Sequence, residues 1–131
     1  MTKDYINPPS LWDAQPRGYS HVVQVSAPSS LIFVAGQAAV NAELQVVADD
    51  IEGQTRAIFG NLQQALGTAG ATLDDIVAMT IYLRDISHQW AVRKVRSEFF
   101  PGNRLPVSTM VEVSRFSLDA MLIEITVIAA R

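Results

Sequence analysis

The segment Ile76-Val77-Ala78-Met79-Thr80-Ile81-Tyr82-Leu83 carries apolar side chains at both odd and even positions. Because the side chains of a strand alternate between its two faces, this segment is apolar on both of them. We therefore expect a central strand that is covered on both sides. The patterns before and after it predict the order β-β-α-β-α-β-β.

The first part of the chain predicts two strands that pair with each other. Residues 19–27 alternate apolar and polar side chains, which is typical of a half-buried strand, and residues 31–35 form a short apolar run. The polar turn at residues 28–30 separates them, so we expect a hairpin. Residues 1–18 are rich in Pro, Asn, Asp and Gly, and we expect them to form an irregular N-terminal arm.

Two helices are predicted, one before and one after the central strand. The first follows the pair Asp49 and Asp50, either of which can cap it. The second covers residues 87–100 and ends at the Pro-Gly pair that follows. Final strands are expected around residues 107–113 and 121–129. One mixed sheet with both helices packed on one face satisfies this order, so we predict an α+β fold.

The composition narrows the class of protein. The chain has 131 residues, 49% hydrophobic and 18% charged, with no cysteine and a net charge of −3. This length predicts one domain over residues 1–131, and the low charge content suggests that partner subunits cover some apolar surface. Zero cysteine excludes disulfides, cysteine-ligated metals and a cysteine nucleophile.

The same composition also limits the kinds of binding partner and the cellular location that we expect. The net charge predicts no nucleic-acid surface, and no apolar stretch is long enough to cross a membrane. We expect a cytoplasmic protein, since the N-terminus lacks the basic and apolar regions of a signal peptide.

The carboxylate of Glu124 is the most informative single group. It lies within the apolar run of residues 122–128, where an unpaired charge is costly to bury. It is therefore ion-paired, placed at an exposed edge, or opened to a ligand as a general acid or base. The residues alone leave the structural and the catalytic role open. Glu112, in an alternating strand, is expected to point outward.

Three further residues are candidates for binding a ligand. Gly36 ends an apolar run, where it either forms a hairpin bulge or permits close approach of a ligand to the backbone. Tyr19 lies at a junction between a loop and a strand, either as a residue of the rim or as part of a pocket. Arg104 precedes a strand and could hold a carboxylate, although such a residue is more often solvated. The two histidines, His21 and His88, share no metal-ligand spacing, so no metal site is expected.

Five short motifs, in order along the chain, resemble those of the RidA/YjgF family of reactive-intermediate deaminases. They are Gly18-Tyr19-Ser20, Phe33-Val34-Ala35-Gly36-Gln37, Gln54-Thr55-Arg56 with Asn61-Leu62, Pro106-Val107-Ser108-Thr109-Met110-Val111-Glu112-Val113, and Ile123-Glu124-Ile125. Each motif is weak alone, but their order and separation match nearly from end to end.

The resemblance implies a chorismate-mutase-like subunit that assembles as a homotrimer, with small-molecule pockets at the subunit interfaces. Members with the full motif hydrolyse 2-imino or enamino acids to 2-oxo acids and ammonia without a cofactor. Carried over by position, Glu124 would position the attacking water and Tyr19 would line the pocket. The backbone of Gly36 would lie beside the ligand.

Three positions depart from the family's pattern. Ser108 stands where the deaminases have the arginine that binds the substrate carboxylate, Ala35 replaces a serine, and Met110 replaces a frequent cysteine. Ser108 and Thr109 offer hydroxyl groups to a substrate in place of the lost arginine. Arg104 is a candidate to replace its charge.

Two functions are therefore open from the sequence. The first is a cofactor-free hydrolase or deaminase that acts on a small imine, enamine or amide. The second is a non-catalytic trimer that binds a small metabolite in the same interface pocket.

Overall fold

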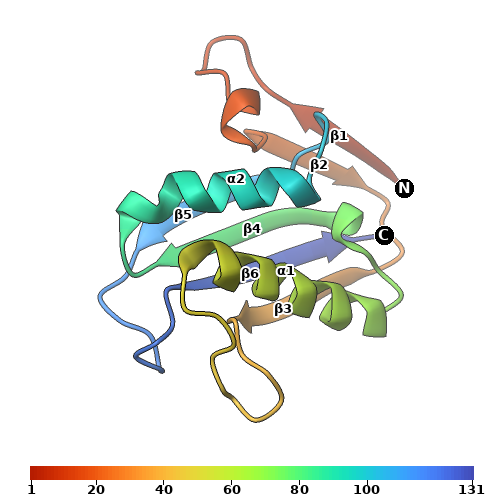
Figure 1. Ribbon diagram of the computed structural model, residues 1–131. Helices are drawn as coiled ribbons and strands as arrows, with labels where there is room; N and C mark the ends of the chain where they lie inside the picture. The colour runs from red at the N-terminus through yellow and green to blue at the C-terminus, as the bar shows by residue number, and fades with distance from the viewer.

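A four-stranded mixed sheet forms the centre of the molecule, which the computed structural model describes from Met1 to Arg131 (Figure 1). Its strands are β3 (Leu31–Gln37), β6 (Ile123–Ala130), β4 (Ile76–Leu83) and β5 (Val107–Glu112), in the order β3-β6-β4-β5. β6 is antiparallel to both of its neighbours, and β5 is parallel to β4. The segment quoted first thus forms an inner strand, as predicted.

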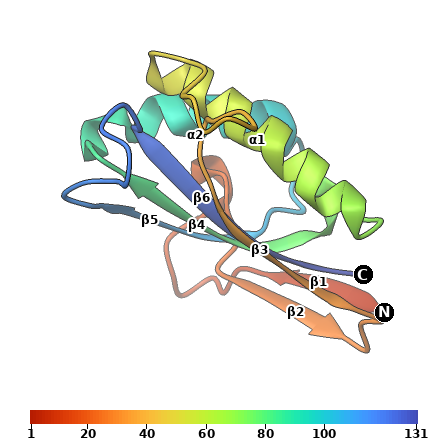
Figure 2. The ribbon, with the colours of Figure 1, turned by 90° about the horizontal axis from the view of Figure 1, so that it is seen from below.

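Both helices, α1 (Ile51–Thr68) and α2 (Gln89–Phe99), pack on one face of this sheet (Figure 2). Of the two candidate caps, Asp50 is the one used, because its Oδ1 accepts a hydrogen bond of 2.7 Å from the Gly53 amide. The helix α2 connects β4 to the parallel strand β5. The predicted α+β architecture is therefore confirmed.

The core lies between the helices and alternate residues of the strands. In β6 the residues that face the helices are fully buried (Ile123, Ile125, Val127 and Ala129), and they join a cluster that includes Phe59 of α1. Between them, Glu124, Thr126 and Ile128 point to the other face and are only half-buried. We call this second side the open face of the sheet.

The open face corrects the prediction that the central strand is covered on both sides. Thr80 and Tyr82 of β4 lie half-buried on it, because both helices pack on the opposite side. An apolar pattern on both faces of a strand shows what can be covered. It does not show that a single chain supplies both covers.

The N-terminal region corrects two further predictions. Residues Thr2–Ile6 form the strand β1, which pairs antiparallel with β2 (Val22–Ser26), and the two make a separate sheet (Figure 2). The predicted hairpin of β2 with β3 is therefore wrong, and so is an irregular arm over residues 1–18. Alternation in β2 specifies which face is buried, and it does not specify which neighbour the strand pairs with.

Three short 3-10 helices complete the structure, at Gln15–Arg17, Leu73–Asp75 and Ile86–His88. Neither α1 nor α2 has the combination of length and apolar sequence that would let it cross a bilayer.

Candidate functional site

Glu124 lies on the open face of the sheet, in close contact with the backbone of β3. A Cβ atom added to Gly36 would lie 2.7 Å from the Glu124 Oε2 atom, which is closer than real Cβ contacts allow. Glycine at this position therefore makes the space that the carboxylate occupies. The pair brings a carboxylate and an exposed stretch of backbone together.

The Glu124 carboxylate is half-buried, and it takes part in none of the ion pairs of the chain. Its strand neighbour on β4 is Tyr82, so its surroundings on the open face include an aromatic side chain. A half-buried carboxylate without a cationic partner can accept a proton from water and return it to a leaving group.

Ser108 lies on the opposite side of the sheet from Glu124. In the parallel pairing of β5 with β4, Ser108 is opposite Met79, which belongs to the core, so its side chain faces the helices. Thr109 is opposite Thr80 and is exposed on the open face. Within one chain the structure therefore brings Thr109 to the same face as Glu124, and it separates Ser108 from both.

An arginine that the sequence analysis did not single out occupies the space beside Ser108. The Arg96 Nη1 atom of α2 donates a hydrogen bond of 3.1 Å to the Ser108 hydroxyl, and Nη2 donates one of 2.7 Å to the Arg17 carbonyl. Only 3% of Arg96 is exposed. Burial, and secondarily the nearby charge of Arg93, lowers the pKa of Arg96 to about 10.

A cavity of about 150 Å³ opens next to this arginine. It is lined by Tyr19, Arg93, Arg96, Ser108 and Met110. The Tyr19 hydroxyl accepts a hydrogen bond of 2.5 Å from the Trp12 indole. The structure thus places Tyr19, Ser108 and Met110 around one cavity, and the guanidinium groups that complete it come from α2.

The turn before Tyr19 is shaped to admit Arg96. Gly18 has φ = 87°, and a Cβ atom there would lie 2.8 Å from the Arg96 Nη2 atom. Only glycine combines this backbone conformation with so close a guanidinium. One signal in the sequence could have revealed Arg96, because it follows Val92 by one helical turn and so falls on the buried stripe of α2.

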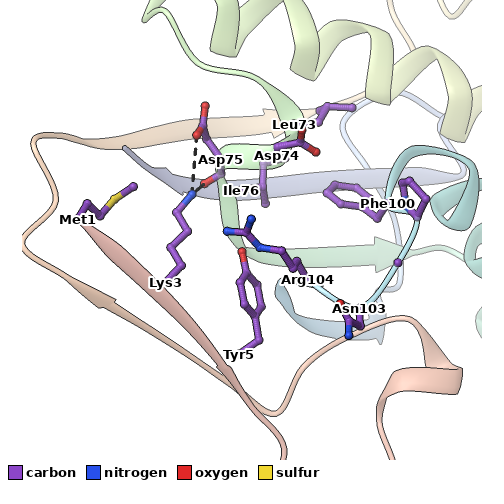
Figure 3. A pocket seen from close by; sticks show the side chains of 12 residues that line it. Met1, Lys3, Tyr5, Leu73, Asp74, Asp75, Ile76, Phe100, Asn103 and Arg104 are labelled. Carbon is purple, nitrogen blue, oxygen red and sulfur yellow. Dashed lines mark hydrogen bonds and ion pairs between the residues drawn. The ribbon is translucent and has the colours of Figure 1, made fainter.

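Arg104 lies elsewhere, in a cavity of about 510 Å³ between β1 and the start of β4 (Figure 3). Its guanidinium carbon is 5.4 Å from the centre of the Tyr5 ring. Across this cavity the Lys3 ammonium lies 3.7 Å from an oxygen of Asp75. The residue beside Ser108 is thus Arg96, and Arg104 is not among the residues that line that cavity.

Ala35 is exposed on β3 next to Gly36, and its carbonyl accepts a hydrogen bond of 3.1 Å from the Gln37 side chain. The register between β3 and β6 shifts between Val34 and Gln37, which includes these two residues. Such a bulge re-aims the backbone of an edge strand. The structure holds no cluster of three or more His, Asp or Glu side chains that could hold a metal ion.

Comparisons with known proteins identify the family of the chain. The family model described as endoribonuclease L-PSP matches residues 13–131. The chain belongs to the RidA/YjgF family. A RutC family protein of Pyrococcus abyssi is 39% identical over 112 residues, which cover 85% of this chain and 84% of that protein. A RutC family protein of Saccharolobus solfataricus is 40% identical over 114 residues, or 86% of each chain.

Solved structures of the RidA/YjgF family share the fold. A Rid family protein of unknown function from Yersinia pestis, YyfB, superposes with a TM-score of 0.90 at 29% identity and covers 100% of both chains. A YjgF family member from Mycobacterium tuberculosis superposes with a TM-score of 0.69 at 34% identity, covering 99% of this chain and 100% of that one. The fold is therefore chorismate-mutase-like, as the resemblance implied.

Proposed function

We propose that this RidA/YjgF family member is a cofactor-free hydrolase of small imines, enamines or amides. The observation that carries the proposal is the Glu124 carboxylate, half-buried in an apolar strand, outside the ion pairs of the chain and seated against the Gly36 backbone. A carboxylate in this environment suits proton transfer to and from water better than it suits a structural role.

The proposed reaction balances without a cofactor. Glu124 takes a proton from water as the water oxygen bonds to the carbon of a C=N group, which gives a carbinolamine. The protonated Glu124 then returns the proton to the nitrogen. Glu124 next takes the proton of the carbinolamine hydroxyl and passes it to the nitrogen, so that the C–N bond breaks as the carbonyl forms and ammonia leaves. Acid–base catalysis of this kind contributes about 100- to 10,000-fold to the rate.

We further propose that the complete site forms between subunits of a homotrimer. Glu124 and Thr109 lie on the open face, whereas Tyr19 and Ser108 line the cavity on the helix side. The two groups belong to opposite faces of one sheet, so a substrate that contacts both needs two chains. Exposed apolar side chains on the open face, including Phe33 at 72%, support such an assembly.

The test is the release of ammonia from a panel of small imines and enamines that are generated in solution. We expect the wild-type protein to accelerate release from at least one of them, and Glu124→Gln to lose at least about 100-fold of that acceleration. The matched control is Asp4→Asn, which removes an exposed carboxylate from β1 and should leave the rate unchanged.

The panel also distinguishes the non-catalytic alternative. If no compound is turned over by wild-type protein but several raise its melting temperature, the chain is a binding protein and the hydrolase proposal is wrong. If Glu124→Gln retains full activity, hydrolysis takes place elsewhere in the molecule.

A further inference from the structure

Two arginines of α2 lie together without an acidic partner. Arg93 and Arg96 both line the cavity beside Ser108, and the charge of Arg93 adds to the effect of burial in lowering the pKa of Arg96. The ion pairs of the chain use other cations, namely Lys3, Arg56 and Lys94. The two guanidinium groups therefore form a concentrated positive charge that nothing in the chain neutralises.

Arg96 is buried with its charge uncompensated. Its two hydrogen bonds go to neutral oxygens, the Arg17 carbonyl and the Ser108 hydroxyl. A buried cation without an anion is destabilising, and the loss is recovered when an anion binds next to it. Gly18, which makes room for Arg96, shows that the surrounding backbone is shaped around this charge.

Arg93 supplies a second and independent indication of a ligand site. Its Nη1 atom is buried and has no hydrogen-bond partner. Its guanidinium carbon lies 4.6 Å from the centre of the Trp90 ring, a cation–π contact that holds the group in place. Because nearly all buried donors in proteins are paired, an unpaired guanidinium N–H beside a cavity indicates an acceptor that the chain does not itself provide.

The cavities next to these arginines have the volume and the lining for a small organic acid. One cavity of about 150 Å³ contains Tyr19 and Met110, and another of about 260 Å³ contains Phe100 and Leu105. No aspartate or glutamate lines either of them. A carboxylate would meet the planar guanidinium groups, which match its geometry, and its carbon chain would lie against apolar side chains.

We propose that Arg93 and Arg96 form a binding site for a small organic carboxylate. The site is on the helix side of the sheet, away from Glu124. Binding of a carboxylate there does not depend on hydrolysis. The inference rests on the proposed function in one respect. A substrate that contacts Glu124 of one subunit and this cavity of a neighbouring subunit would carry the carboxylate.

Binding of propionate to the full-length protein tests the inference. Calorimetry and tryptophan fluorescence, to which Trp90 next to Arg93 contributes, should show saturable binding at constant ionic strength. We expect Arg93→Gln to weaken binding by about 10- to 100-fold, the range for a charge-assisted pair. Arg115→Gln, which removes an exposed arginine from the loop after β5, should bind as the wild type does.

Further variants separate a binding role from a structural one. Arg96→Lys keeps the charge and loses the planar fork, so it should bind propionate more weakly while remaining folded. Glu124→Gln should bind propionate normally, which distinguishes a failure of this site from a failure of hydrolysis. The inference is overturned if propionate does not bind saturably, if Arg93→Gln binds equally well, or if inorganic phosphate binds more tightly than propionate.

Discussion

Gly36 leaves the space in which the Glu124 carboxylate lies. In Gly36→Ala the new Cβ atom would lie 2.7 Å from Oε2, so the carboxylate must move away from its present site. Gly36 is not among the residues with positive φ, so we expect little loss of stability. The expected result is a fall in kcat of about tenfold or more with a nearly unchanged melting temperature, because small displacements of catalytic groups are costly.

The control for this change is Gly60→Ala. Gly60 lies in α1, and nothing lies within 4 Å of the position that its Cβ would take. This variant should stabilise the protein by about 0.5–1 kcal/mol and leave kcat unaltered. A Gly36→Ala protein with wild-type kcat would show that the contact does not position Glu124.

At the residue scale, the sequence revealed Glu124 and did not reveal the arginines. A carboxylate inside an apolar strand is unfavourable to bury, and this conflict can be recognised from the sequence alone. Arg96 also occupies a buried position, but long basic side chains often lie along apolar stripes and reach solvent. Its contact with Ser108, 12 residues further along the chain, depends on how α2 packs on β5.

At the scale of elements, an ion pair joins the two helices. Arg56 of α1 donates to both carboxylate oxygens of Glu98 of α2, at 3.1 and 2.7 Å. The hydrogen bond from Arg56 holds the pKa of Glu98 below its ordinary value. The stability that the pair contributes is therefore present above the ordinary pKa of a glutamate and is lost as the pH falls through the lowered value.

The variant Glu98→Gln tests this pair. We expect its melting temperature to be slightly below that of the wild type at pH 7, since exposed pairs contribute little. The difference should disappear as the pH is lowered past the pKa of Glu98 in the folded protein. Thermal unfolding followed between pH 7 and pH 3 measures it, and a difference that stays constant over this range would contradict the assignment.

The elements themselves were predictable to different degrees. Both helices could be predicted, because their apolar stripes and the cap at Asp50 are local signals. The pairing of β2 was not, since strand partners are chosen by contacts far apart in the sequence. β1 is rich in polar residues, and its inward side chains are Lys3 and Tyr5, so its sequence resembled a loop.

At the scale of the whole molecule, the open face is the surface through which we expect copies of the chain to associate. Leu31 and Phe33 on β3 are 54% and 72% exposed, and Val111 on β5 is 40% exposed. Phe33→Lys places a charge among them and should shift the protein from the proposed trimer to a monomer at micromolar concentration. Light scattering measures the mass.

The control for association is Leu11→Lys, which changes a residue of the N-terminal region that is 46% exposed. It should leave the mass unchanged. A wild-type protein that is monomeric at these concentrations would contradict both the trimer and a site shared between subunits. The sequence alone could not identify the association surface, because a surplus of apolar residues does not show where on the molecule they are exposed.

A comparison of wild-type protein and Glu124→Gln, with turnover and binding measured on the same samples, tests the proposed hydrolase function most sharply. We predict that kcat for ammonia release from a small carboxylated imine falls by at least about 100-fold in the variant. Propionate should bind equally to both proteins. Equal kcat values, or a wild-type rate no higher than that in buffer alone, would contradict the proposal that Glu124 activates water for hydrolysis.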